Sequence, residues 1–363
     1  MDRRTFLKTS GAVAGTAAVA GSATAAAPPL PAPALATGMR ELTMVTSWAP
    51  DQVGHARSAE NFASRLETAL DGRYTIKVYG AGERSDPLRC FDALGNGTAD
   101  LYHSVEYHHQ ARSKAFAFFA AVPFGLNADE MNAWVLYGGG QKLWDDLAGQ
   151  FGIKPFLCGN TGSQSTTWFK APPASLADLE ALAIHMPGLG GDLVRALGAA
   201  PVTLAGANVG PALAAGTIAA AEGTGPYGDL ASALHQAAGH MYSPGIHGPG
   251  TVLSLGVRRA LWDRMSRSDQ IILAAIAMSQ NSLTLAEANA NNAMALDTLV
   301  RRHGVRVATF PAGIAKGLRE AGADILATAA NADMQTRKVY ESYTGFRKIA
   351  LERSQVPGAA FVA

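Results

Sequence analysis

The sequence has no marked excess of charge of one sign, few aromatic residues and few cysteines. Its 363 residues include 30 basic and 29 acidic side chains, and aromatic residues make up 7%. Without a basic excess the chain lacks the electrostatic footprint of a nucleic-acid-binding protein, and no basic amphipathic helix indicates binding to a membrane surface. Sparse aromatic residues beside abundant alanine and glycine favour helices packed on sheets over an all-β sandwich.

The two cysteines, Cys90 and Cys158, both lie in apolar stretches. Two thiols in an exported chain can pair, but the sequence does not place them within bonding distance. We interpret them as buried free thiols, with a disulfide as the alternative.

Long apolar runs are missing after the N-terminal segment, where no stretch has 18 or more apolar residues without a charge. A soluble mature protein is therefore expected. The N-terminal segment carries Arg3 and Arg4, followed by a short apolar run over residues 11–21. This pattern predicts a removable export signal that resembles a twin-arginine leader, because the run is shorter than the ~20 residues of a membrane span. An uncleaved amphipathic anchor is the alternative.

We predict that residues 1–36 are this signal followed by a proline-rich linker, and that the mature protein is periplasmic. Removing them takes away three basic residues and one acidic residue, so the net charge changes from +1 to −1. The remaining chain of about 325 residues exceeds the usual size of one hydrophobic core, which indicates two lobes.

Alternating strand-like and helix-like patterns indicate an α/β fold. The first unit has strands expected at 42–48, 74–79 and 99–104 and helices at 54–70 and 86–95. A second unit has strands expected at 153–159, 182–186, 201–204 and 218–222 and helices at 192–197 and 209–215. Sheets of this kind bind ligands at loops beyond their strand ends, so two units predict two lobes that face a cleft.

A long helix is predicted over residues 268–302, which contain no proline or glycine and begin with the cap pair Ser268-Asp269. Its length of roughly 50 Å is enough to span both lobes. We therefore expect a first lobe over residues 37–158, a second over 159–260, and the spanning helix with further C-terminal helices over 261–363.

Short motifs in one order through nearly all of the mature chain carry a family resemblance. They are Ala81–Glu83, Ala120–Leu126, Asn132–Trp134, Tyr137–Gly140, Gly159–Gln164, Trp168–Phe169, Pro211–Leu213, Gly216–Glu222, Gly225–Tyr227, Pro244–Gly245 and Gly250–Thr251. On these motifs the chain resembles the substrate-binding subunits of TRAP transporters, in the branch that binds α-keto acids and related monocarboxylates. The resemblance implies two α/β lobes hinged around a ligand, and delivery of that ligand to small and large membrane subunits.

The resemblance also implies a site for a ligand and a metal ion. In the branch, a glutamine at the position of Gln164 binds both, and a glutamate at the position of Glu222 coordinates the metal with the backbone of the next residue, here Gly223. Amide and carboxylate oxygens suit a hard cation such as Na⁺ or Ca²⁺, or another divalent ion. Asn160, in the same turn as Gln164, is a further ligand candidate. The alternatives are a turn-stabilising Gln164 and a Glu222 that is solvated or paired with a basic side chain.

His185 departs from the resembled pattern. The resemblance implies an arginine at this position, whose guanidinium holds the ligand carboxylate through two parallel hydrogen bonds. A histidine is mostly neutral near pH 7 and cannot form this bidentate contact. Each charge-assisted bond lost in this way removes roughly 1.5–3 kcal/mol. We expect His185 to lie in the pocket, so that either the ligand is not a simple carboxylic acid or another cation supplies the charge.

Further ligand candidates lie at strand exits and turns: His103, Tyr107, Asn208 and His247. For His247, as for His55, His108 and His109, a surface or packing role is the more ordinary interpretation, because no compact metal-ligand spacing joins them.

Catalysis is not indicated, because the sequence has no GxSxG elbow, no P-loop, no GxGxxG after a strand and no zinc-protease spacing. We predict that the protein is not an enzyme but an extracytoplasmic solute-binding protein of a TRAP-type importer, as a monomer or homodimer. It would capture a small organic solute, with a carboxylate held beside a metal ion as one candidate. The alternative is an exported binding protein for a non-carboxylate or more apolar ligand, in sensing or carriage.

Overall fold

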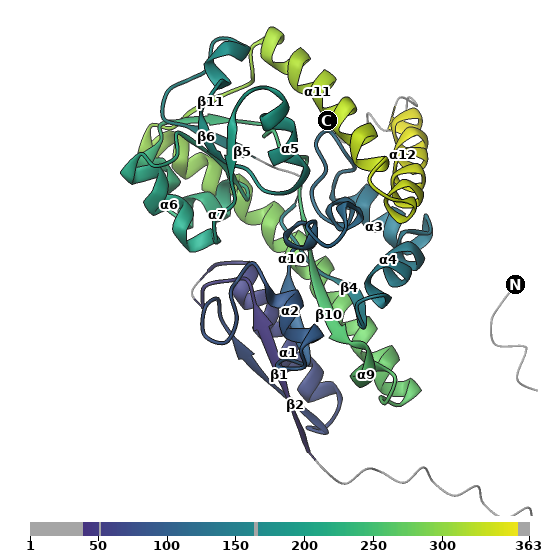
Figure 1. Cartoon of the computed structure of the whole chain (residues 1–363). Coiled ribbons are helices and arrows are strands. Elements are labelled where there is room, and N and C mark those ends of the chain that lie inside the picture. The colour runs from purple at the N-terminus through teal and green to yellow at the C-terminus, as the bar shows by residue number, and fades with distance from the viewer. Residues whose placement is uncertain (1–38, 51, 163–165, 355–363) are drawn as a thin grey trace, which may run out of the picture. The chain divides into compact units, whose positions relative to one another are not determined.

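Two β-sheets carry the fold of the computed structural model, which describes residues 39–50, 52–162 and 166–354. The first sheet has the strand order β2-β1-β3-β10-β4. Its strands are β1 (Arg40–Thr46), β2 (Tyr74–Tyr79), β3 (Leu101–Ser104), β4 (Ile153–Asn160) and β10 (Val252–Arg258). β1 pairs in parallel with β2 and β3, and β10 runs antiparallel between β3 and β4. Figure 1 shows this sheet below the second one.

The second sheet has the order β11-β9-β5-β8-β6-β7. Its strands are β5 (Thr166–Phe169), β6 (Ala183–His185), β7 (Ala200–Val202), β8 (Ala220–Gly223), β9 (His240–Tyr242) and β11 (Arg306–Ala308). β6 lies parallel to both β7 and β8, whereas β5 lies antiparallel to β8 and β9. The carboxyl ends of β6 and β8 therefore meet at one edge of the sheet, which places His185 and Glu222 at neighbouring strand ends.

Helices cover both sheets. Around the first sheet they are α1 (His55–Ala69), α2 (Cys90–Gly95), α3 (Ala128–Tyr137) and α4 (Gly140–Gly149), with the 3₁₀ helices η1 (Glu106–His109) and η2 (Lys114–Phe119). From β5 to β9 they are η3 (Leu176–Leu179), α5 (Gly188–Ala196), α6 (Gly206–Ala215), α7 (Pro226–Ala231) and α8 (Leu234–Ala237). The last ones are α9 (Arg259–Trp262), α10 (Arg267–His303), α11 (Ala312–Ala330) and α12 (Met334–Ser354). The two-lobed α/β architecture expected from the sequence is confirmed.

Both cysteines lie in the core of the first sheet, in different apolar clusters. Cys90 belongs to a cluster with Phe116, Phe119 and Trp134, and Cys158 belongs to a second cluster, with α1 and α10. Both cysteines are buried and free, which confirms the interpretation made from their apolar contexts.

The chain returns to the first sheet after building most of the second. β10 belongs to the predicted second lobe, residues 159–260, yet it lies between β3 and β4 of the first sheet. Gly256 allows this close passage, because a Cβ there would stand 2.2 Å from the Tyr102 ring. The predicted lobe boundaries otherwise stay a prediction.

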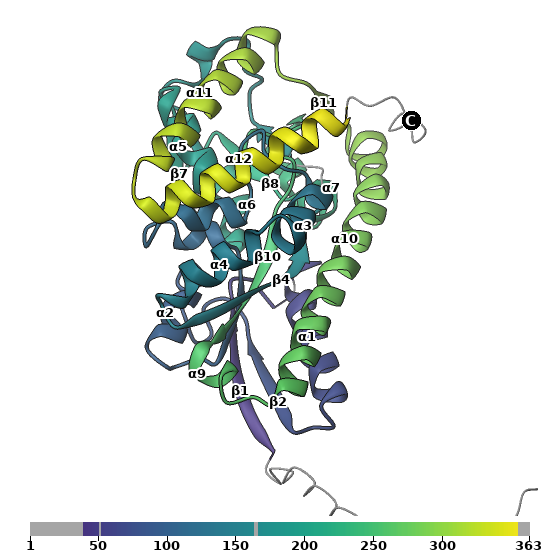
Figure 2. The ribbon, with the colours of Figure 1, turned by 90° about the vertical axis from the view of Figure 1, so that its right-hand side faces the viewer.

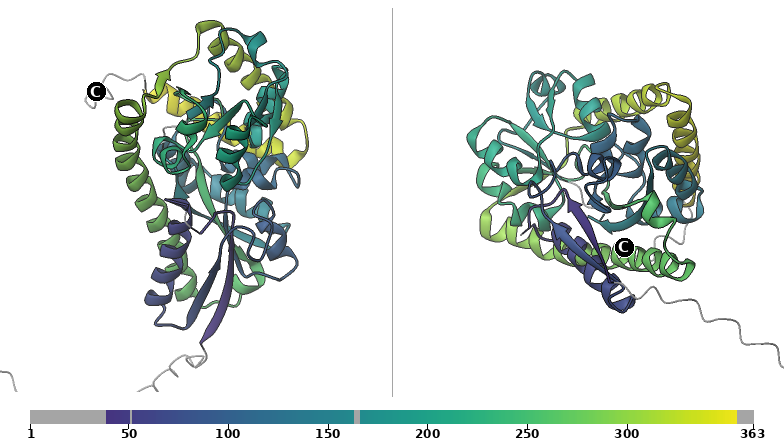
Figure 3. Two further views of the ribbon diagram at one scale, coloured as in Figure 1. Left: turned by 90° about the vertical axis from the view of Figure 1, so that its left-hand side faces the viewer. Right: turned by 60° about the horizontal axis from the view of Figure 1, so that its bottom comes forward.

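The predicted long helix is α10, which runs one residue further at each end than the predicted range. It packs on β4 of the first sheet and on α1 beside that sheet, and on α7 beside the second sheet. Figures 2 and 3 show it running along both sheets. Among the described residues it is the one helix long and apolar enough to cross a membrane by length and composition. Its buried residues include the polar side chains Gln280, Asn281, Thr284 and Asn292.

Two connecting segments between the sheets are hydrogen-bonded to each other. The Thr161 N–H donates to the Thr251 carbonyl at 2.9 Å, and the Thr251 N–H donates to Thr161 Oγ1 at 2.9 Å. α10 holds the first segment as well, because the Asn160 N–H donates to Thr284 Oγ1 at 2.9 Å. The crossing between the sheets is therefore fixed by backbone bonds and by the long helix.

Thr284→Val should destabilise the fold by about 1–3 kcal/mol, because the buried Asn160 N–H would lose its acceptor while the side-chain volume stays nearly the same. Thr298→Val is the matched control, since its exposed hydroxyl bonds only its own helix, at Met294. Urea unfolding followed by circular dichroism measures both. Equal losses in the two variants would contradict the role given to Thr284.

Candidate functional site

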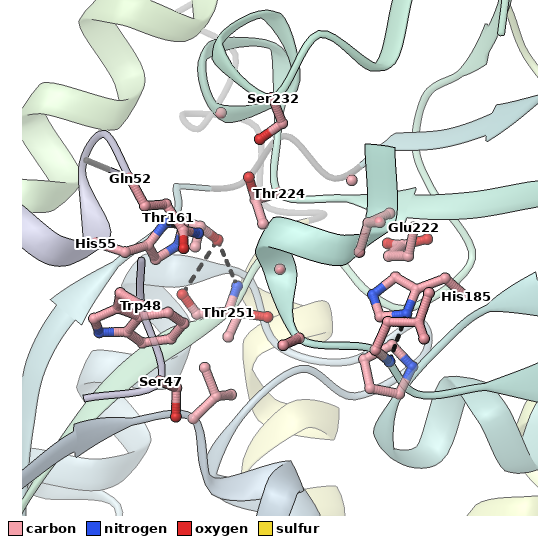
Figure 4. Close-up of a pocket in the computed structure, with 18 of the residues that line it drawn as sticks. Ser47, Trp48, Gln52, His55, Thr161, His185, Glu222, Thr224, Ser232 and Thr251 are labelled. Carbon is pink, nitrogen blue, oxygen red and sulfur yellow. Dashed lines mark hydrogen bonds between the residues drawn. The ribbon is translucent and has the colours of Figure 1, made fainter. Parts of the chain in front are cut away.

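A cavity of about 340 Å³ lies between the two sheets, at their strand ends. From the first sheet its lining comes from the loop after β1, with Trp48 and Gln52, and from η1, with Tyr107 and His108. Segments around the second sheet contribute His185, Glu222, Asp229 and His247. Figure 4 shows Glu222 near His185 on one side of the cavity, and Trp48, Gln52, His55 and Thr161 on the other.

Glu222 is held by neutral donors. Its Oε2 accepts a hydrogen bond from Thr167 Oγ1 at 2.8 Å, and the same hydroxyl accepts one from the Ile246 N–H at 3.0 Å. Burial raises the pKa of the Glu222 carboxyl well above its usual range, and the nearby Asp229 raises it further. The carboxyl thus lacks the positive charge that would stabilise its ionised form.

Asp229 fixes the turn that follows Glu222. Its Oδ2 accepts from Thr166 Oγ1 at 2.5 Å and from Trp168 Nε1 at 2.8 Å, and its Oδ1 accepts from the Thr224 N–H at 2.9 Å. Burial raises its pKa to about 6 although these donors oppose the shift. Because a Cβ on Gly223 would stand 2.4 Å from both Asp229 oxygens, only glycine fits at the residue after Glu222.

The described part of the cavity wall contains no basic side chain. None of the residues that the structure places around the cavity is a lysine or arginine. No ion pair among the described residues joins Glu222 or Asp229 to a basic side chain. A buried carboxylate without a partner is costly, so this wall favours a cation that arrives from outside the protein.

His185 presents a neutral imidazole to the cavity. The Leu204 N–H donates to His185 Nδ1 at 3.2 Å, so in the neutral ring the proton is on Nε2. Burial lowers the pKa of His185 to about 4. His185 therefore offers a hydrogen-bond donor but no charge near pH 7.

Two further histidines lie beside His185. Burial, and then the nearby His185, lower the pKa of His108 to about 4 and that of His247 to about 3. The Tyr107 ring lies between them, 4.9 Å from His108 and 5.2 Å from His247 between ring centres. His247 Nε2 is buried without a hydrogen-bond partner among the described residues.

His103 lies behind the cavity wall rather than in it. The fully buried ring accepts a hydrogen bond from Trp48 Nε1 on Nδ1 at 2.7 Å, and its Nε2 lies 3.1 Å from the Cys158 carbonyl. With Nδ1 as the acceptor, Nε2 carries the proton and donates to that carbonyl. His103 thus fixes the orientation of Trp48, which does line the cavity.

The structure brings most, but not all, of the predicted site together. Tyr107, His185, Glu222, Gly223 and His247 line the cavity, while Gln164 lies outside the described residues. Asn160 is buried beside a smaller cavity that α10 also lines, and Asn208 is exposed, with its neighbours Ala207 and Val209 lining the main cavity instead. The ligand roles of these residues stay predictions.

Two histidines line the cavity although the sequence favours a surface or packing role for them. They are His55 and His108, whereas His109 packs in the core against Phe91. The signal for His108 was its position four residues after the end of a predicted strand. The sequence does not reveal which of two adjacent histidines in a 3₁₀ turn faces a cleft.

The comparisons with known proteins agree with this geometry. Residues 44–333 match the family model of bacterial extracellular solute-binding proteins, family 7, called DctP. The chain is 34% identical over 305 residues to a monocarboxylate 2-oxoacid-binding periplasmic protein of Nostoc, covering 84% of this chain and 83% of the relative.

Two solved structures of TRAP solute-binding proteins share the fold and 28% sequence identity each. The protein from Bordetella bronchiseptica, a dimer with calcium and picolinate in its site, has a TM-score of 0.85 and covers 89% of this chain and 96% of its own. The protein from Pseudoalteromonas atlantica, with sodium and pyruvate, has a TM-score of 0.86 and covers 90% and 99%.

The fold and the cleft define an extracytoplasmic solute-binding protein and not an enzyme. The chain belongs to the DctP family of TRAP-transporter solute-binding proteins.

Acidification should destabilise this protein through its buried imidazoles. Burial lowers the pKa of His55, His103 and His185 to about 4 each, whereas an unfolded histidine titrates near 6.5. Between these values the unfolded chain binds protons that the native state does not. Each such histidine therefore reduces stability as the pH falls from about 6.5 towards 4, by about 1.4 kcal/mol per pH unit. Glu106 and Asp229, with raised pKa values of about 7 and 6, act in the opposite direction.

His185→Leu isolates one of these contributions. Urea unfolding at several pH values between 5 and 7 should give a shallower pH dependence than in the parent protein. His303→Leu is the control, because His303 is exposed at the end of α10. An unchanged pH dependence in His185→Leu would show that this ring is not held neutral by the fold.

Proposed function

We propose that the cavity captures a small 2-oxo acid or related monocarboxylate together with a metal ion, and that the protein delivers the solute to the membrane subunits of a TRAP importer. The observation that carries this proposal is the pair of carboxyl groups, the buried Asp229 and the part-buried Glu222, in a wall without lysine or arginine among its described residues. A carboxylate ligand alone would place another acidic group beside these two. A cation that enters with it would favour the ionised form of Glu222 and offset the charge of the ligand.

The donor atoms suit a hard cation. Glu222 contributes a carboxylate at the cavity wall and Gly223 a backbone carbonyl, and Gln164 is the predicted amide ligand. Oxygen donors of these types are those preferred by calcium, and the relatives with bound calcium or sodium support the same choice. When bound, the ion supplies the positive charge that Glu222 lacks and a contact for the ligand oxygens.

The neutral His185 then has a defined role. With its proton on Nε2, it donates to a ligand oxygen. This contact orients the ligand without charge, so the ion provides the electrostatic part of the affinity. This division accounts for a monocarboxylate site in which His185 stands where the resembled branch has arginine.

Pyruvate should stabilise the protein only when Ca²⁺ or Na⁺ is present. In a sodium-free buffer, a thermal-shift titration with pyruvate should show a rise in Tm with CaCl₂ and little or none with EDTA, since ligand at 100 times its Kd stabilises by about 2.7 kcal/mol. Glu222→Gln should abolish the calcium-dependent rise. Glu180→Gln, an exposed acid of the second sheet region, should keep it.

Equal stabilisation by pyruvate with calcium and with EDTA would remove the metal from the proposal. If 2-oxo acids and other monocarboxylates have no effect under either condition, while an uncharged solute stabilises the protein, the solute class is wrong and the alternative of a non-carboxylate ligand takes its place.

We also propose export by the twin-arginine pathway, on the basis of Arg3 and Arg4 and the short apolar run after them. Replacing both arginines by lysine should leave the protein in the cytoplasm, because this pathway reads the arginine pair rather than charge alone. Fractionation of cells, with the unchanged leader as control, measures the outcome. Normal export of the lysine variant would contradict the proposal.

A further inference from the structure

The side of the cavity that faces away from Glu222 is an apolar wall. Trp48, Val105 and Leu253 form one buried cluster, and all three line the cavity. Figure 4 shows Trp48 and Glu222 on opposite sides of it. From the second sheet region, Leu204 and Val209 also line the cavity. A ligand whose charged end is at Glu222 would extend its other end towards these side chains.

Two polar groups on the Trp48 side, the indole N–H and the Ser47 hydroxyl, are already paired within the protein. Trp48 Nε1 donates to His103 Nδ1 at 2.7 Å, which leaves only the apolar part of the indole for a ligand. Ser47 Oγ lies 2.7 Å from Ser104 Oγ and donates to the Pro87 carbonyl at 2.5 Å. A polar group of a ligand placed here would find few free partners, so the wall favours an apolar group.

Two aromatic rings form part of this wall. The rings of Trp48 and His55 lie 4.8 Å apart between centres, with 33° between their planes. His55 Nδ1 lies 3.2 Å from Gln52 Nε2, and its pKa is lowered by burial to about 4, so the imidazole is uncharged. Since His103 fixes the indole, the wall keeps its shape before the ligand arrives. Flat, rigid aromatic surfaces of this kind pack well against another ring.

The cavity extends from Glu222 to Trp48 (Figure 4). Its volume of about 340 Å³ is in the range of pockets that hold small organic ligands. A ligand that fills the space from Glu222 to Trp48 must carry a side chain beyond a methyl group.

We propose that the preferred solute is a 2-oxo acid or related monocarboxylate with a bulky, ring-bearing apolar side chain, which packs against Trp48 and His55. This inference rests on the proposed function, because it places the acid group and the ion at Glu222. In it Trp48 determines specificity, and His103 is a positioning residue that acts through Trp48.

Isothermal titration calorimetry in calcium-containing buffer tests the proposal with three acids that share one head group: pyruvate, 4-methyl-2-oxopentanoate and phenylpyruvate. Affinity should rise in this order, with phenylpyruvate at least about tenfold tighter than pyruvate, as is expected when additional apolar groups fill a hydrophobic site. Trp48→Leu should lower the affinity for phenylpyruvate much more than that for pyruvate. Trp262→Leu is the matched control, because Trp262 packs on Phe156 in the first sheet region and does not line the cavity.

Val209→Phe offers the same test if Trp48→Leu does not fold, since it fills the cavity from the other side and should also weaken phenylpyruvate selectively. Tighter binding of pyruvate than of both larger acids, or an unchanged preference in both variants, would overturn this inference and leave the proposed function intact. Failure of all three acids to bind, with and without calcium, would instead overturn the proposed function and this inference with it.

Discussion

The cleft depends on one electrostatic constraint, which is that acidic and imidazole groups are buried together without a basic side chain among the described lining residues. Burial keeps His108, His185 and His247 neutral and makes ionisation of Glu222 unfavourable in the empty protein. The wall therefore contains donors and acceptors but no fixed positive charge. An anion and a cation that enter together satisfy this wall better than either does alone, so capture of the solute and of the ion is expected to be cooperative.

Hydrogen bonds behind the wall fix the groups that face the cavity. Asp229 and Thr167 hold the strand end that carries Glu222, the Leu204 N–H sets the ring of His185, and His103 sets that of Trp48. Each of these partners is protein rather than ligand. The site is therefore largely formed before binding, which lowers the conformational entropy lost when a solute is captured.

The sequence predicted those elements whose patterns are local. β1, α1, β2 and the long α10 follow from alternation and helical periodicity within their own residues, although Ser266 and not the predicted pair Ser268-Asp269 caps α10. β10 was missed, because a strand buried on both faces and carrying Gly256 has no alternating pattern, and its place between β3 and β4 depends on partners about 100 to 150 residues away.

The residues of the site could also be predicted only in part. Glu222 and His185 could be placed at the cleft because the family resemblance implies ligand or metal contacts at both positions. His103 also ends a strand, but its ring is turned behind Trp48, a contact over 55 residues that no spacing encodes. His55 faces the cavity from the first turn of α1, where a packing role was the simpler interpretation.

The pairing of polar atoms around Trp48 also has a consequence for water. Solvent in that half of the cleft has few protein groups to bond, so it is held weakly and is readily displaced. Displacing it by an apolar group should give solute capture a negative heat-capacity change that grows with the size of the side chain, while the Glu222 half contributes mainly through the ion. The contribution of the Trp48 half to solute affinity would then depend on temperature, and that of the Glu222 half on salt and pH.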